Sequence, residues 1–191
     1  MDLTVFLEPK VDLPRVAHIL DGLGPMGRLE TIRGWDARTM SALWDAAKGK
    51  SQLTMEHFVP ASVGPMTEVM HEGMNSLPVF TPVQKRMART KDGVVFGYND
   101  VETQVFVGPG FFTVNPGKND GELDIDYRAV PVHRLPSWPA VAPNTDGLGR
   151  FVWGDLVDVM RGISSHVSIG SSFKQGKALG VFFAVSRVDP G

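Results

Sequence analysis

The sequence predicts an α+β fold, in which a helical segment at residues 1–90 packs on or caps an antiparallel β-barrel at residues 91–191. From Val94 onward, short apolar segments alternate with turns rich in glycine, proline and asparagine, as in a β-meander. No segment in this half is long enough to form the helical crossover that parallel strands require. A sheet of about seven such strands must curl, split or close to bury its apolar face, and we expect closure. The 191 residues fit a single domain.

The composition excludes several classes of protein. The chain has no cysteine, which rules out disulfides, thiolate catalysis and Cys-ligated metals. The formal net charge of −2 and the scattered Lys and Arg residues argue against nucleic acid as a partner. The first residues lack the features of a signal peptide, and no apolar run is long enough to span a membrane. We therefore expect a cytoplasmic protein without a membrane span.

Two helices are predicted near the N-terminus. Residues 11–20 carry apolar side chains at helical spacing, and Asp36 is a favourable N-cap for a second helix that runs to about Ala47. On this second helix, four apolar residues at i, i+3, i+4 and i+7 are predicted to pack against the sheet: Met40, Leu43, Trp44 and Ala47.

The region that follows these helices is predicted to contain only short elements and loops. Residues 53–60 fit either a short helix or a strand, and a weak helical pattern covers residues 66–73. Prolines near both ends of residues 75–82 make that stretch extended or looped.

Strand signals begin at residue 94. Residues 94–98 and 104–107 are apolar and strand-like, and a Gly-Pro-Gly sequence then predicts a hairpin leading to a strand at residues 111–114. Residues 115–121 give a second strong turn signal.

Residues 122–128 alternate strictly between apolar and charged side chains, which is the clearest period-2 pattern in the chain. Leu123, Ile125 and Tyr127 share one face, while Asp124 and Asp126 lie on the other. Burial of the apolar face inside the sheet is the simplest interpretation. In the opposite register the two carboxylates, about 7 Å apart, would line a cavity. Burial would then raise the pKa of one of them into a range suited to acid–base chemistry.

The remaining strands follow a long loop, which four prolines predict at residues 131–143. Residues 155–161 fit either a helical turn or a strand. Strand-like segments lie at residues 151–153, 166–170 and 179–188.

Two short motifs have little supporting context. Residues 22–27 match G-x-G-x-x-G, but a predicted helix and not a strand precedes them, so a linker or helix C-cap fits better than a nucleotide site. Glu68 and His71 have E-x-x-H spacing in a single copy, whereas di-iron bundles need two. The five histidines show no paired spacing. We therefore predict no metal site and no cofactor.

The C-terminal strands resemble those of lipocalin-like (calycin) β-barrels. A strand at residues 166–170 ends in Ile-Gly, a basic turn containing glycine follows at residues 174–177, and an aromatic-rich strand closes with Arg187. Small intracellular barrels of the nitrobindin and plastid-fibrillin type end in a similar way. The resemblance implies a closed lipocalin-like barrel around an apolar ligand cavity. The chain lacks the N-terminal G-x-W-x-G-type signature of nitrobindin, so the resemblance does not imply haem binding.

The predicted function is binding of a small hydrophobic or amphipathic molecule inside the barrel. An alternative is a cofactor-independent enzyme, such as a cyclase, isomerase or lyase, that uses acid–base residues in the same cavity. A third interpretation is a protein-interaction module built on the proline-rich loop around Trp138. A homodimer is compatible with each of them.

The candidate site residues come from the strand-like segments. If the protein is an enzyme, the predicted catalytic residues are Asp126, His166 and Tyr98. The predicted ligand-binding residues are Phe96, Tyr98, Phe106, Phe112, Asp124, Trp153 and Phe182.

Overall fold

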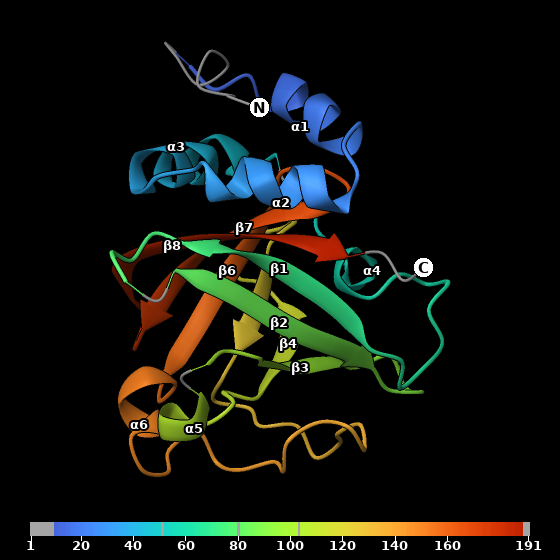
Figure 1. Cartoon of the computed structure of the whole chain (residues 1–191), viewed down its shortest axis with the longest axis vertical. Coiled ribbons are helices and arrows are strands. Elements are labelled where there is room, and N and C mark those ends of the chain that lie inside the picture. The colour runs from blue at the N-terminus through green and yellow to red at the C-terminus, as the bar shows by residue number, and fades with distance from the viewer. Residues whose placement is uncertain (1–9, 51, 80, 103, 189–191) are drawn as a thin grey trace.

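In the computed structural model, residues 10–188, apart from residues 51, 80 and 103, are described, and they form a closed antiparallel β-barrel beneath a layer of helices (Figure 1). The strands follow the chain around the barrel, each pairing with the next, and β8 pairs back onto β1 to complete the closure. The eight strands are β1 (Val69–Asn75), β2 (Pro82–Arg89), β3 (Val95–Asn99), β4 (Phe112–Pro116), β5 (Leu123–Asp126), β6 (Leu156–Gly162), β7 (Val167–Lys174) and β8 (Lys177–Val188).

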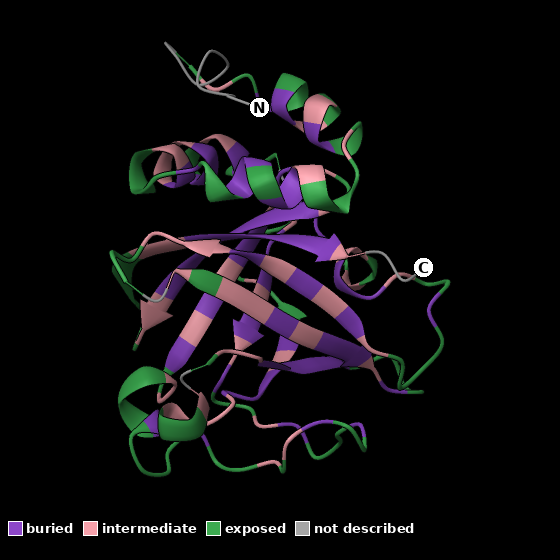
Figure 2. Ribbon diagram, viewed as in Figure 1, coloured by how far each residue is buried: buried purple, intermediate pink, exposed green. Residues whose placement is uncertain are grey.

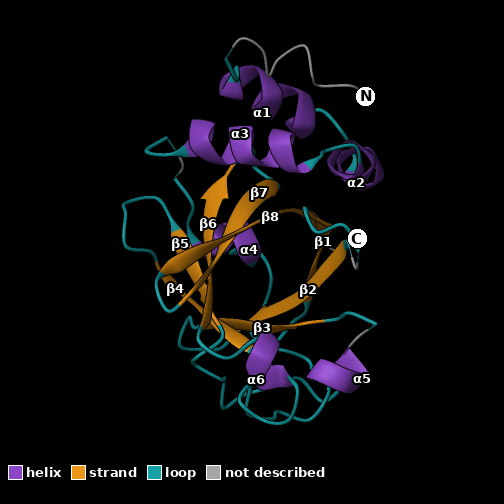
Figure 3. Cartoon of the chain, turned by 90° about the vertical axis from the view of Figure 1, so that its left-hand side faces the viewer, coloured by secondary structure: helices purple, strands orange, loops and turns teal. Residues whose placement is uncertain are grey.

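Three helices cover one side of the barrel: the second and third lie over β1, β6, β7 and β8, and the first packs against the third (Figure 3). They are α1 (Leu13–Asp21), α2 (Pro25–Arg33) and α3 (Ala37–Ala47). Their apolar faces form one cluster with outward-facing residues of the last strands, including Val167, Ile169 and Ala184. The helices therefore cover a part of the sheet that would otherwise expose apolar side chains (Figure 2).

Local sequence explains where these helices begin. The Asp36 side chain accepts a hydrogen bond of 2.7 Å from the backbone N–H of Thr39 and so caps α3. Asp12 caps α1 in the same way, through the N–H of Arg15 at 3.1 Å. Both predicted helices are confirmed, and so is the buried apolar stripe of α3.

The short helix α4 (Met55–Phe58) closes one end of the barrel from inside. Phe58 is fully buried in the interior cluster, and its carbonyl oxygen lies 2.9 Å from Nε2 of the buried His71 on β1. Arg187, near the end of β8, donates to the carbonyl of His57 at 2.7 Å. Apolar packing and hydrogen bonds to the barrel wall therefore fix α4 in place.

The opposite end of the barrel carries two more one-turn helices, α5 (Gln104–Val107) and α6 (Gly149–Val152), which lie side by side (Figures 1 and 3). Neither one fills the interior. Phe106 on α5 and Phe151 on α6 are exposed. The barrel is therefore filled at the α4 end and hollow at the α5–α6 end.

A long segment without regular structure, residues 127–148, covers the outer face of β2 and β3. Trp138 packs edge-on against Phe96 and Tyr98, and its indole N–H donates to Glu68 at 2.6 Å. The predicted loop is confirmed. It buries aromatic residues that would otherwise lie on the surface of the sheet.

Some predicted elements are wrong. β1 and β2 lie in residues 66–90, which were expected to be helical or looped, so the barrel begins at Val69 and not near residue 91. The expected strand at residues 104–107 is α5, and the expected strand at residues 151–153 lies in α6 and the turn after it. The helix α2, which begins at Pro25, was not predicted from the sequence. For β1 and β2, pairing with other strands outweighed weak local preference.

The position of α4 inside the barrel allows a test of the interior packing. Phe58→Ala should lower the free energy of unfolding by about 3–5 kcal/mol, because it leaves a cavity among apolar side chains. Phe106→Ala, the same substitution at an exposed position, should change it by less than about 0.5 kcal/mol. Urea unfolding followed by circular dichroism measures both values. Equal effects of the two substitutions would contradict the placement of Phe58 in the barrel interior.

The lowered pKa of His57 on α4 leads to a second prediction. Burial, reinforced by nearby positive groups, lowers the pKa of His57 to about 3 from the usual 6.5. As the pH falls from 6.5 towards 3, the unfolded chain gains a proton at this residue that the folded chain does not, so stability should decrease. His57→Gln should show a smaller decrease over this range in pH-dependent urea unfolding. An unchanged pH profile would show that His57 does not contribute.

Candidate functional site

The hollow end of the barrel contains a cavity of about 690 Å³, lined in part by residues of α5 and α6. This volume falls in the range of small-molecule sites, about 300–1,000 Å³. The walls are mostly apolar and come from several strands and from the segment after α6; they include Val83, Leu156, Val181, Phe183 and Trp153. The floor is polar.

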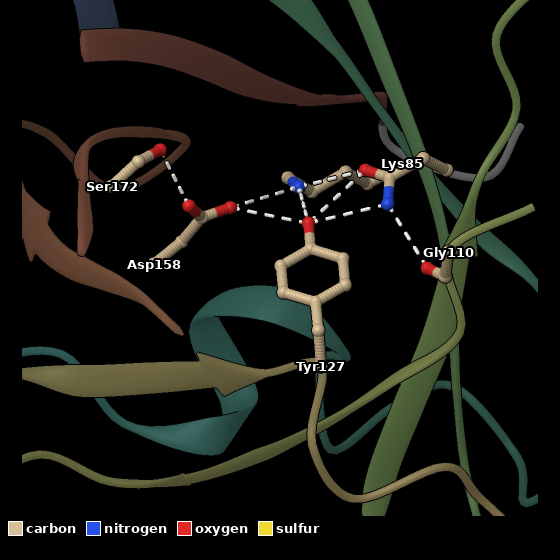
Figure 4. Close-up of polar contacts among 6 residues, drawn as sticks. Lys85, Gly110, Tyr127, Asp158 and Ser172 are labelled. Atoms are coloured by element: carbon tan, nitrogen blue, oxygen red, sulfur yellow. Dashed lines mark hydrogen bonds and ion pairs between the residues drawn. The ribbon is translucent and has the colours of Figure 1, made fainter. Parts of the chain in front are cut away.

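Lys85 lies at this floor, on the inward face of β2. Its ammonium group donates to Asn99 Oδ1 at 2.8 Å and to the Tyr127 hydroxyl at 2.6 Å, and it lies 3.5 Å from Asp158 Oδ2 (Figure 4). The side chain is 3% exposed. The rings of Phe112 and Phe183 flank the ammonium, with centroids 5.4 and 4.9 Å from Nζ.

Asp158 is the only carboxylate bound to this lysine in the described structure, and two hydroxyl groups orient it. Ser172 donates to Oδ1 at 2.7 Å, and the Tyr127 hydroxyl donates to Oδ2 at 3.1 Å (Figure 4). Ser172 lies directly opposite Asp158 in the pairing of β6 with β7. Asn99 similarly lies opposite Lys85 in the pairing of β2 with β3. Strand register therefore places the two charges and their polar partners on the same interior level.

Tyr127 sits at the centre of the group, just after β5, and its surroundings hold it in place. The Trp153 ring stacks on it, with centroids 5.2 Å apart and planes 17° apart. The side-chain amide of Asn144, from the covering loop, donates to the Tyr127 carbonyl at 2.7 Å. The phenol ring and the backbone are thus fixed independently.

Gly110 gives Trp153 the room it needs. The residue has φ of +57°, and a Cβ there would lie 2.6 Å from the indole ring. Its carbonyl also accepts a hydrogen bond of 3.0 Å from Asn99. Only glycine combines this backbone conformation with this contact. Lys85, Asn99, Gly110, Tyr127, Asp158 and Ser172 are called the floor cluster below.

Burial dominates the electrostatics of the floor cluster. It lowers the pKa of Lys85, although the charge and hydrogen bond of Asp158 oppose the shift. Burial also raises the pKa of Tyr127 well above 10, and the negative charge of Asp158 adds to that effect. The tyrosine is therefore a neutral hydrogen-bond donor and acceptor between an amine and a carboxylate.

The two aspartates that the sequence analysis proposed as site residues, Asp124 and Asp126, lie outside the cavity. Leu123, Ile125 and Tyr127 face the interior, which places Asp124 and Asp126 on the outer face of β5. Partial burial alone would raise the pKa of Asp126, but hydrogen bonds from the side chain and backbone of Arg128 lower it overall. Burial and neighbouring carboxylates raise the pKa of Asp124. Neither residue lines the cavity.

The other predicted site residues divide between the two faces of the barrel. Phe96 and Tyr98 pack under the covering loop, and burial raises the pKa of Tyr98. Phe182 contacts Trp44 on α3, Phe106 is 73% exposed, and His166 lies before β7 near Asp21. Only Phe112 and Trp153 point towards the interior, where both contact Tyr127. The structure therefore does not bring Asp126, His166 and Tyr98 together.

The sequence pattern pointed to Tyr127 as inward-facing but did not reveal Lys85 or Asp158. Alternation was visible in residues 122–128, whereas β2 carries Lys85 and Arg89 on its inward face among charged neighbours. Asp158 lies in a segment that fits a helical turn or a strand equally well. The one sequence signal for an inward Asp158 was its place between Leu156 and Met160, since the three residues alternate with others in a period-2 pattern.

No group of three or more metal-binding side chains occurs among the described residues. None of the helices in that part of the chain combines the length and the apolar character of a membrane span.

Comparison of the chain with protein-family models, with curated proteins and with solved structures finds no match. The resemblance to lipocalin-like barrels therefore stands on the closed, eight-stranded antiparallel barrel alone.

A double-mutant cycle tests the coupling between Lys85 and Asp158. Lys85→Met should lower the free energy of unfolding by about 3–5 kcal/mol, because it leaves the Asp158 carboxylate buried without its cation. Adding Asp158→Asn should recover most of this loss, because the amide keeps hydrogen bonds to Ser172 and Tyr127 without a charge. Urea unfolding at neutral pH measures all four proteins. Additive effects would show that the two charges are not coupled.

Proposed function

We propose that the barrel binds a small amphipathic molecule, with an apolar body along the cavity walls and a polar group at the floor cluster. The supporting observation is that an apolar-walled cavity open to solvent ends at a buried polar group of defined geometry. Binding sites for small molecules combine these two features, since apolar walls supply affinity and a few fixed polar groups supply orientation.

The chemistry of the floor cluster favours a ligand with one polar end. Lys85 and Asp158 largely neutralise one another, so the site does not favour a multiply charged molecule. An oxygen-bearing group could accept a hydrogen bond from Lys85 or exchange hydrogen bonds with Tyr127. The rest of the molecule would contact Val83, Val181 and Phe183.

A series of linear primary alcohols tests this proposal by titration calorimetry. Each added methylene should strengthen binding by about 0.8 kcal/mol, roughly threefold to fourfold, until the chain fills the cavity. The series should therefore show a chain-length optimum. The lack of any dependence on chain length would contradict the proposal.

Matched variants locate the binding site. Val181→Trp places an indole in the cavity and should abolish binding of decan-1-ol. Val157→Trp makes the same change on the other face of β6 from Asp158 and should leave binding intact. Equal loss in both variants would indicate general damage, and equal retention would place the alcohol outside the cavity.

A further inference from the structure

Lys85 is the only lysine among the described residues that line the cavity, and its amine lies at the inner end of the apolar walls. A molecule that enters from the mouth therefore meets this nitrogen after its apolar part has left water. The amine is one of the few groups in a protein that forms a covalent bond with a carbonyl compound directly. Its position raises the question of whether it can act as a nucleophile.

A nucleophilic amine must first lose a proton, and the floor cluster contains a path for it. The Tyr127 hydroxyl lies 2.6 Å from Nζ and 3.1 Å from Asp158 Oδ2. Tyr127 can accept a proton from the ammonium and pass its own to the carboxylate. This transfer gives a neutral amine and leaves its proton on the Asp158 carboxyl group. Burial also lowers the pKa of Lys85, which favours the neutral amine.

We propose that Lys85 captures the carbonyl group of an apolar aldehyde as an imine. This inference rests on the proposed function, since it specifies the chemical class of the cavity ligand. Asp158 then serves as the counter-ion of the protonated imine, and Tyr127 serves as the proton carrier. Ser172 and Asn99 hold these two groups in place and make no contact with the reacting carbon.

The reaction balances without an oxidant, a reductant or a cofactor. The lone pair of Nζ forms a bond to the carbonyl carbon, and the π electrons move to the oxygen, which takes a proton from Tyr127 or Asp158. The nitrogen then loses a proton to the same pair. The hydroxyl oxygen then takes a second proton from Tyr127 or Asp158 as the carbon–oxygen bond breaks, and it leaves as water. The nitrogen lone pair completes the C=N bond. Aldehyde, amine and the protonated carboxyl group become a protonated imine, a carboxylate and water.

Reductive trapping tests the inference in the full-length protein. The protein is incubated with decanal and sodium cyanoborohydride at neutral pH, and intact mass and peptide mapping follow. One decyl group per chain is expected, on Lys85, at aldehyde concentrations that leave the exposed lysines unmodified. Labelling spread over exposed lysines such as Lys91 and Lys118, with Lys85 unmodified, would overturn the inference.

The control variants are chosen so that loss of folding does not imitate loss of reactivity. Lys85→Met combined with Asp158→Asn removes the amine and keeps the cluster uncharged, and Lys91→Met removes an exposed amine. The double variant should lose the adduct while its urea unfolding shows a folded protein, whereas Lys91→Met should keep the adduct. An undiminished adduct in the double variant would overturn the inference.

Binding of decan-1-ol separates this inference from the proposed function. If the wild-type protein binds the alcohol but gives no adduct with decanal, the cavity binds ligands and the imine chemistry is wrong. If it binds neither, the proposed function itself fails, and the inference fails with it.

Tyr127→Phe tests the proton carrier. The rate constant of trapping should fall about a hundredfold. Affinity for decan-1-ol should fall only by the effect of one lost hydrogen bond, about tenfold or less, because the aromatic ring and its stack with Trp153 remain. Equal losses in rate and affinity would show that Tyr127 has only a structural role.

Discussion

Pairing of β8 with β1 is the constraint on which the rest of the structure depends. It removes both edges of the sheet and divides every strand into an inward and an outward face. The outward faces are then covered, by α1–α3 on one side and by the loop around Trp138 on another. The inward faces must fill the barrel or leave a cavity. Phe58 and its neighbours fill one end, and the other stays open.

The polar residues at the open end follow from the same geometry. Lys85, Asn99, Asp158 and Ser172 occupy inward positions of four strands, and register brings them to one level. A buried lysine or aspartate alone would cost several kcal/mol, so each stabilises the other. A core that only needed filling would use apolar residues at these positions, because a buried ion pair seldom adds stability over apolar packing. The charges therefore fit the proposed role of the floor cluster, which is to bind the polar group of a ligand.

The fold class could be predicted from the sequence, but only some of the individual strands and helices could. The alternation that ends at Tyr127 and the Asp36 cap are local signals, and both predictions agree with the structure. β1 and β2 carry too many polar residues to resemble strands in isolation, and partners far along the chain fix their pairing. Lys85 was missed for this reason. Its inward direction depends on register, and a charged residue in an unrecognised strand is normally assigned to the surface.

A crystal structure of the protein with decan-1-ol is the most direct test of the central claim, that the apolar cavity presents its ligand to the floor cluster. The account predicts the alkyl chain along Val83, Val181 and Phe183, with its hydroxyl oxygen within hydrogen-bonding distance of Lys85 Nζ or the Tyr127 hydroxyl. An alcohol bound only on the exposed surface of α5 and α6, with the cavity collapsed or unoccupied, would contradict it.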